Sequence, residues 1–157
     1  GIALLHLATA EPTAVASMVV VSAPPYFPMQ TRAIQRQTSA AMFSDVEMDL
    51  MRGRHKYGEE QIEALFAHSR ALADTWDDVA FTPPHLSTVT AETLIVFGDR
   101  DPLYPVSLAF ELHAAMPGSH LWVVPNGGHG PVFGENAMRF SETALSFLGG
   151  AWKRLPT

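Results

Sequence analysis

Three short runs of almost purely apolar residues are the clearest pattern along the chain. They cover residues 18–21, 93–97 and 121–124 and are rich in valine, leucine and isoleucine. Continuous apolar runs of this length are typical of strands buried on both faces, as in a parallel sheet. Each run soon reaches a proline or a glycine, which ends regular strand pairing. The pattern therefore predicts about three parallel strands.

Segments with helical character flank these runs. Residues 1–10 are apolar nearly all round, which predicts a helix buried on several sides. Pro105 suits the first turn of a helix that runs to about residue 116. A last helix is expected over about residues 135–148, before two glycines that end it. Helices and strands that alternate in this way predict an α/β fold.

The long stretch between the first and second apolar runs has a different character. From about residue 28 to residue 80 it is more polar, and its apolar residues follow helical spacing. Its best segment is 59–78, where apolar side chains recur at i, i+3 and i+4 and share one face. A helical insertion is therefore expected here. The predicted face consists of Ile62, Leu65, Phe66, Ser69, Leu72, Ala73 and Trp76.

Composition narrows the possible function classes. The chain has 157 residues, 47% of them hydrophobic, and a formal net charge of −6. This charge disfavours nucleic acid and anionic membrane surfaces as partners. No stretch resembles a membrane span or a secretory signal. The absence of cysteine excludes disulfides and thiolate metal sites, and it fits a cytoplasmic protein.

Two loops carry the candidate chemistry, one after each of the last two predicted strands. The first presents Asp101 shortly after Gly98, and the second presents His129 between glycines. Sites in an open parallel sheet form beyond the carboxyl ends of strands, and neighbouring strands lie about 4.8 Å apart. The two loops are therefore expected to meet. In such a pair the carboxylate accepts from Nδ1 of the imidazole, and Nε2 serves as general base and then as general acid.

Each of these residues also has a plainer interpretation. His129 would then be a loop histidine without a chemical role, and Asp101 a turn residue or a helix N-cap. Asp99 is interpreted as a turn or surface acid. Ser22 is interpreted as structural, although its place at a strand end also suits a residue that lines a site. The remaining histidines, which show no metal-ligand spacing, are His6, His55, His68, His85, His113 and His120.

The two loops resemble those of the α/β-hydrolase-fold family. Gly-Asp-Arg-Asp-Pro-Leu-Tyr-Pro-Val at 98–106 resembles the acid loop, with Asp101 rather than Asp99 in the place of the catalytic acid. Gly-Gly-His-Gly-Pro at 127–131 resembles the histidine loop. The opening Gly-Ile-Ala-Leu-Leu-His-Leu-Ala resembles the helix that follows the family's nucleophile elbow.

The resemblance covers essentially the whole chain and implies its organisation. Residues 1–27 and 87–157 would form the C-terminal part of an α/β-hydrolase sheet, and residues 28–86 a helical cap or lid insertion. Large side chains in and near this insertion would either line an acyl pocket or simply pack its helices. They are Tyr26, Phe27, Met42, Phe43, Phe66 and Trp76.

One part of the family's pattern is missing, because the sequence contains no Gly-x-Ser-x-Gly. The chain is therefore expected to begin within the domain, with the nucleophile a few residues before Gly1. The resemblance implies a hydrolase of a small carboxylic ester or lactone that works through an acyl-enzyme. His129 would be the base and Asp101 would orient it, and neither a metal nor an organic cofactor is implied.

The alternative is a chain that is not catalytic by itself. It would be a truncated fragment, or a half-domain that pairs with another chain to complete its sheet. The expected partners are a small ester-like substrate and, in addition, a second copy in a homo-oligomer or a complementing N-terminal half. A sheet with exposed edges favours such pairing.

Overall fold

The computed structural model describes residues 1–152 and divides the chain into two compact units. The first unit joins Gly1–Tyr26 to the chain from Val79 onward, and the second is Phe27–Asp78. Each unit has its own cluster of buried apolar side chains. Both candidate loops belong to the first unit.

The first unit is built on three strands, β1 (Ser17–Val21), β2 (Glu92–Gly98) and β3 (Ser119–Val124). All pairings are parallel, and β2 lies between β1 and β3. The register sets Val21 beside Val96 and Gly98 beside Val124, so the carboxyl ends of the strands share one edge of the sheet. The predicted α/β fold with about three parallel strands is confirmed.

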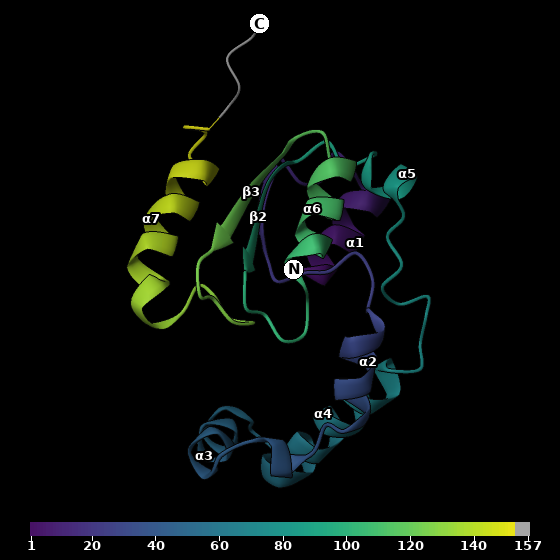
Figure 1. The fold of residues 1–157 in the computed structure, drawn as a ribbon, viewed down its shortest axis with the longest axis vertical. Helices are drawn as coiled ribbons and strands as arrows, with labels where there is room; N and C mark the ends of the chain where they lie inside the picture. The colour runs from purple at the N-terminus through teal and green to yellow at the C-terminus, as the bar shows by residue number, and fades with distance from the viewer. Residues whose placement is uncertain (153–157) are drawn as a thin grey trace, which may run out of the picture. The chain divides into compact units, whose positions relative to one another are not determined.

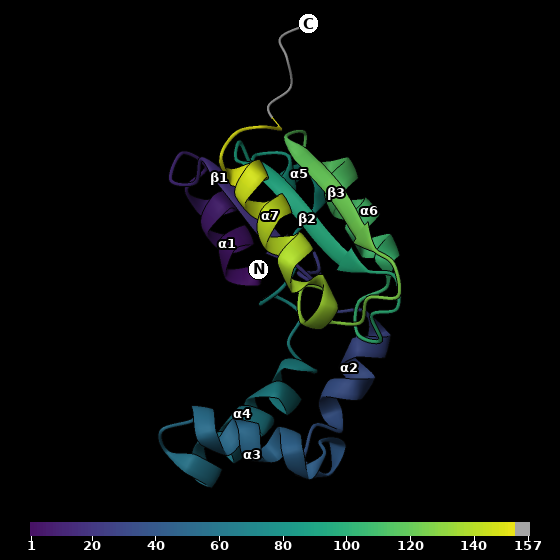
Figure 2. The same cartoon turned by 90° about the vertical axis from the view of Figure 1, so that its left-hand side faces the viewer.

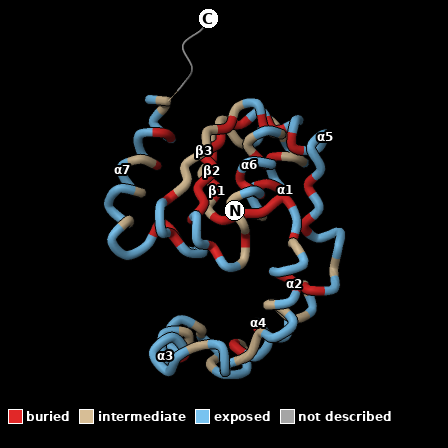
Figure 3. The backbone as a smooth tube through the Cα atoms, viewed as in Figure 1, coloured by how far each residue is buried: buried red, intermediate tan, exposed pale blue. Residues whose placement is uncertain are grey.

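The helices of this unit are α1 (Ile2–Ala10), α5 (Pro83–Leu86), α6 (Val106–Ala115) and α7 (Ala137–Leu148), the last preceded by the 3₁₀ turn η2 (Gly134–Asn136). Figure 1 shows α7 on one face of the sheet and α1 and α6 on the other, and Figure 2 shows α7 in front of the sheet, running roughly along the strands. On its face, Phe147 packs with Leu94, Val96 and Val124. The strands form the buried layer between the helices (Figure 3), which is why apolar side chains run almost continuously through them.

The first helix differs from the expectation in its burial. It buries Leu5 and Ala8, whereas Leu4 and Leu7 are 37% and 43% exposed. The helix packs on β1 through its buried side. The prediction of a helix buried on several sides is therefore wrong for the described residues.

The second unit consists of α2 (Met29–Arg36), the 3₁₀ turn η1 (Ala40–Met42), α3 (Asp45–Arg54) and α4 (Gly58–Leu72). A capping box opens α3: the Ser44 hydroxyl accepts from the N–H of Glu47, and the Glu47 carboxylate accepts from the N–H of Ser44. Ile62 and Phe66 of α4 are buried together with Met48 of α3. These contacts confirm Ile62 and Phe66 as members of the predicted apolar face, whereas Leu65, expected on the same face, is 46% exposed.

The second half of that segment is not helical to its end. α4 ends at Leu72, so Trp76 lies beyond the helix and is 60% exposed. The guanidinium of the buried Arg32 lies 3.7 Å from the centroid of the Trp76 ring and donates hydrogen bonds to the carbonyls of Ala73 and Thr75. These tertiary contacts stabilise a non-helical path where the local spacing favours a helix.

The second unit covers most of the segment expected to form a cap. It ends at Asp78, whereas the expected insertion runs to residue 86, and α5 lies in the first unit. Its role as a cap stays a prediction. In neither unit does a helix of residues 1–152 have the length and apolar character needed to cross a membrane.

Candidate active site

The loops that follow β2 and β3 are joined by backbone hydrogen bonds. The N–H of Asp99 donates to the carbonyl of Val124 over 3.2 Å, and the N–H of Arg100 donates to the carbonyl of Gly127 over 2.9 Å. These bonds continue the parallel pairing of the two strands past Gly98. The register of the sheet therefore brings the acid loop and the histidine loop side by side.

Gly98 makes this close approach possible. A Cβ atom at Gly98 would lie 2.1 Å from the carbonyl oxygen of Gly127 and 2.4 Å from that of Gly128. At Gly127 a Cβ atom would meet the Cβ of Pro131 at 2.8 Å. Glycine is thus required at Gly98, where the backbones of the two loops pack directly on each other, and at Gly127, where the side chain of Pro131 packs against the loop.

Asp101 is the buried member of the predicted pair, with a side chain that is 0% exposed. Its Oδ1 accepts hydrogen bonds from the N–H groups of Leu103 (2.8 Å) and Tyr104 (3.0 Å). Its Oδ2 lies 3.0 Å from Nδ1 of His129. One oxygen thus fixes the carboxylate to its own loop, and the other holds the imidazole.

Two opposing effects act on the pKa of Asp101. Burial raises this pKa, whereas hydrogen bonds from His129, Tyr104 and Leu103 favour the carboxylate and lower it. The hydrogen bonds prevail, so the pKa of Asp101 lies below its ordinary value of 3.8. The ionised carboxylate acts only as an acceptor, which assigns the proton of this contact to Nδ1 of His129.

This tautomer leaves Nε2 of His129 as the basic nitrogen. The ring of Tyr104 contacts the imidazole edge-on, with 5.2 Å between centroids. Burial and, after it, the charge of Asp101 raise the pKa of Tyr104 to about 12, so the phenol stays neutral. The imidazole is held by the carboxylate and contacted by an aromatic ring, and the His129 side chain remains 46% exposed.

The structure therefore brings together the two side chains that the sequence singles out. The partner of His129 is Asp101, as expected, and Asp99 is exposed. Their catalytic role stays a prediction. Tyr104 is not predicted as part of the site, because its only signal in the sequence is an aromatic residue three positions after the acid.

Acid should weaken this pair in a defined pH range. Because the pKa of Asp101 lies below 3.8 in the folded protein, the stability it contributes is complete above about pH 5 and is lost as the pH falls through the folded-state pKa. Asp101→Asn removes this titration. We expect the stability advantage of the wild type over Asp101→Asn, measured by urea unfolding, to fall progressively as the pH drops below about 5 and to vanish only below the folded-state pKa of Asp101. An advantage that stays constant or grows on acidification would contradict the lowered pKa.

Other histidines lie at the opposite end of the strands. Nε2 of His120 is 3.6 Å from a carboxylate oxygen of Glu92, and Nδ1 of His113 is 2.9 Å from the hydroxyl of Ser119. Glu92 and Ser119 are the first residues of β2 and β3. Across residues 1–152, no three His, Asp or Glu side chains are grouped so that they could hold a metal ion.

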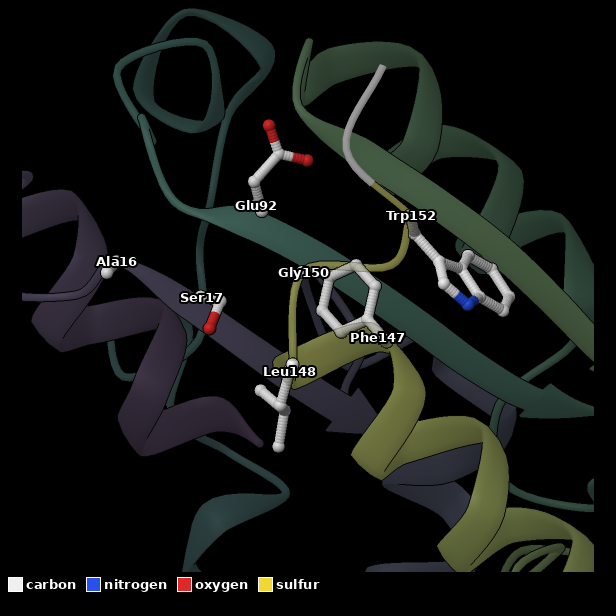
Figure 4. A pocket seen from close by; sticks show the side chains of 8 residues that line it. Ala16, Ser17, Glu92, Phe147, Leu148, Gly150 and Trp152 are labelled. Carbon is white, nitrogen blue, oxygen red and sulfur yellow. The ribbon is translucent and has the colours of Figure 1, made fainter. Parts of the chain in front are cut away.

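A cavity of about 210 Å³ also lies at the amino ends of the strands. It is lined by the starts of β1 and β2 and by the end of α7, and Figure 4 shows the rings of Phe147 and Trp152 there together with the carboxylate of Glu92. Because the strands are parallel, this cavity and the pair of Asp101 and His129 lie at opposite edges of the sheet. The cavity adds no group to the pair.

Comparison with known proteins identifies relatives of this chain. The profile described as "Alpha/beta hydrolase family" matches residues 1–143, which include both loops. A 2-hydroxy-6-oxononadienedioate/2-hydroxy-6-oxononatrienedioate hydrolase of Pseudomonas putida is 33% identical over 101 residues, which cover 64% of this chain and 32% of the relative. A hydrolase of the same name from Klebsiella pneumoniae is 28% identical over 151 residues, which cover 96% of this chain and 47% of the relative. The chain thus spans a third to a half of the length of these relatives.

Solved structures of other proteins share the fold of this chain. The meta-cleavage product hydrolase CumD of Pseudomonas fluorescens matches 94% of this chain and 61% of its own, with a TM-score of 0.66 and 17% identity. An alpha/beta hydrolase from a deep-sea metagenome library matches 99% of this chain and 63% of its own, with a TM-score of 0.68 and 19% identity. At these identities the likeness concerns the fold alone.

The family profile extends from α1 through the second unit and both loops into α7, and the solved structures share the fold over 94% and 99% of this chain and 61% and 63% of their own. The three-stranded parallel sheet is therefore a part of a larger known architecture. The chain belongs to the alpha/beta hydrolase family.

Proposed function

We propose that this protein hydrolyses a carbon–carbon bond beside the ketone of a small 2-hydroxy-6-oxo-dienoate. The observation that carries the proposal is the name shared by three curated relatives, which are hydrolases of 2-hydroxy-6-oxononadienedioate or the corresponding trienedioate. Such a molecule has an unbroken carbon skeleton, so its hydrolysis breaks a carbon–carbon bond. The ketone carbon gains the hydroxyl of water and becomes a carboxylic acid, and the released carbon gains the remaining hydrogen.

The contacts of Asp101 and His129 support this chemistry. Asp101 holds Nδ1 of His129 through a 3.0 Å hydrogen bond, which leaves Nε2 free to act as a base. We expect Nε2 to take the proton of the attacking hydroxyl and to deliver a proton to the leaving carbon. A His129 side chain that is 46% exposed is accessible to a small-molecule substrate.

We further propose that the attacking hydroxyl belongs to a serine outside these 157 residues. The sequence has no Gly-x-Ser-x-Gly. Ser22 does follow a strand, but the next helix begins only at Met29, so Ser22 lacks the strand-turn-helix setting of a nucleophile elbow. The 157-residue chain alone is then inert, and a separately produced N-terminal half restores hydrolysis. A non-catalytic half-domain, the alternative, stays inert with that half added.

An ester or lactone hydrolase is the second candidate. The observation in its favour is the pair itself, because an imidazole oriented by a carboxylate activates a hydroxyl toward any acyl carbon. Ester hydrolysis breaks a carbon–oxygen bond, and the same Nε2 would protonate the leaving oxygen. The two candidates differ only in the leaving group.

A substrate panel separates the two candidates. The gene product that contains these residues is assayed with 2-hydroxy-6-oxononadienedioate and with p-nitrophenyl acetate, and kcat/KM is compared for the two compounds. The proposal predicts a higher kcat/KM for the dienedioate by about 10²-fold or more, since productive use of the whole substrate shows in this ratio. A higher value for the ester would favour the second candidate, and hydrolysis of neither compound would overturn both.

A further inference from the structure

Ser22 occupies an unusual backbone position directly after β1. Its φ angle is +44°, in the left-handed region that side chains other than glycine rarely adopt. Its N–H donates to the carbonyl of Val96 over 2.9 Å, which extends the pairing of β1 with β2 by one residue. The sheet therefore holds Ser22 in a strained conformation at the end of the strand.

The hydroxyl of Ser22 is buried and finds no hydrogen-bond partner among residues 1–152. The residue is 7% exposed. Within residues 1–152, Ser22 Oγ and Gln35 Oε1 are the buried side-chain polar atoms for which no partner is found. A buried hydroxyl without a partner opposes folding, and in native proteins such a group calls for a specific explanation.

The position of Ser22 in the sheet links these two features to the candidate active site. Ser22 bonds to Val96, two residues before Gly98, and the acid loop starts at Gly98. It therefore lies at the carboxyl edge of the sheet, one strand away from the acid loop. Two destabilising features at one residue on this edge are typical of a functional position, because strain and unpaired polar groups persist where function needs them.

We propose that the Ser22 hydroxyl is a substrate-binding group that donates a hydrogen bond to a carbonyl or carboxylate oxygen of the substrate. The inference rests on the proposed function, since both candidate substrate classes carry such an oxygen. A hydroxyl that is already desolvated loses no further water when it meets this oxygen. Binding then supplies the partner that the hydroxyl lacks.

The test is Ser22→Ala in the gene product, with stability and kinetics measured together. The variant keeps the backbone strain and loses only the unpaired hydroxyl, so we expect the Tm to rise by about 2–4 °C. Removal of the binding hydrogen bond should lower kcat/KM for 2-hydroxy-6-oxononadienedioate by about tenfold, mainly through KM. A Tm that rises while kcat/KM falls indicates a group that serves substrate binding at the expense of stability.

Ser119→Ala is the matched control. Ser119 is also buried, but its hydroxyl donates to the carbonyl of Met116 over 2.7 Å, at the amino end of β3. We expect this variant to lower the Tm and to leave kcat/KM unchanged. A Ser22→Ala protein that is less stable than the wild type would mean that the hydroxyl has a structural partner, and this would overturn the proposal. Unchanged kcat/KM and KM would overturn it equally.

A binding measurement separates this inference from the proposed function. Cleavage on the dienoate side of the 6-oxo carbon of the dienedioate releases succinate, which serves as the probe in a calorimetric titration. Weaker succinate binding by Ser22→Ala, by about tenfold, supports the inference even if the wild type hydrolyses neither test compound. Equal succinate affinity of wild type and variant, or no binding by the wild type, would overturn it.

Discussion

Replacement of His129 by alanine should lower kcat for the preferred substrate by about 10³-fold or more, with little change in the Tm. The imidazole is the one group positioned to move a proton in the described site, and general acid–base groups contribute about 10²–10⁴-fold to rates. Stability should change little because the side chain is 46% exposed. The effect is measured by steady-state kinetics on the gene product, with thermal unfolding recorded for both proteins.

His120→Ala is the control for this variant. His120 also faces a carboxylate, that of Glu92 at 3.6 Å, but it lies at the amino end of the strands. Its removal should leave kcat unchanged. If His129→Ala retained full activity, or if His120→Ala caused the larger loss, His129 would not be the base.

Replacement of Gly98 by alanine should cause the largest loss of stability among the single substitutions considered. The new Cβ would lie 2.1 Å from the carbonyl oxygen of Gly127 and 2.4 Å from that of Gly128. Both neighbours are backbone atoms, which cannot rotate away as a side chain would. The loops must separate, which breaks the hydrogen bond from Arg100 to Gly127 and costs about 3 kcal/mol or more.

Gly128→Ala provides the matched comparison, because a Cβ atom there would have no heavy atom within 4 Å. Its unfolding free energy should lie within about 0.5 kcal/mol of the wild type, as for most unhindered surface changes. Urea unfolding of the two variants gives both values. Similar losses for Gly98→Ala and Gly128→Ala would show that the close packing of the two loops is not what stabilises them.

The sheet and the meeting of the two loops could be predicted from the sequence because both depend on local pattern. Continuous apolar runs such as residues 93–97 have few alternatives to a buried parallel strand. Once β2 and β3 are neighbours, their carboxyl ends coincide, and so do the loops that carry Asp101 and His129. Topology alone therefore brings the acid and the base together.

The features that the sequence does not predict all arise from tertiary contacts. α4 ends at Leu72 because Arg32, far away in sequence, bonds to the carbonyls that follow it. The ring of Tyr104 reaches His129 only because the two loops pair. The φ of +44° occurs at Ser22, a serine. Because positive φ angles are usually found at glycine, the sequence gives no indication of this conformation.

Membership of the alpha/beta hydrolase family does not identify the bond that is broken. The pair of Asp101 and His129 suits both the hydrolysis of a carbon–carbon bond and the hydrolysis of an ester or lactone. The relatives' shared name favours the carbon–carbon bond of a 2-hydroxy-6-oxo-dienoate. The chain covers 32% and 47% of the length of two of these relatives. The kinetic tests should therefore be carried out on the whole gene product that contains these 157 residues.

The most direct test of the account is a double-mutant cycle on Asp101 and His129. The value of kcat/KM is measured for the wild type, Asp101→Ala, His129→Ala and the double variant on the preferred substrate. If Asp101 acts only by orienting His129, the double variant should be as slow as His129→Ala, within about threefold. A double variant whose loss equals the product of the two single losses would mean that the residues act independently, and this would contradict the account.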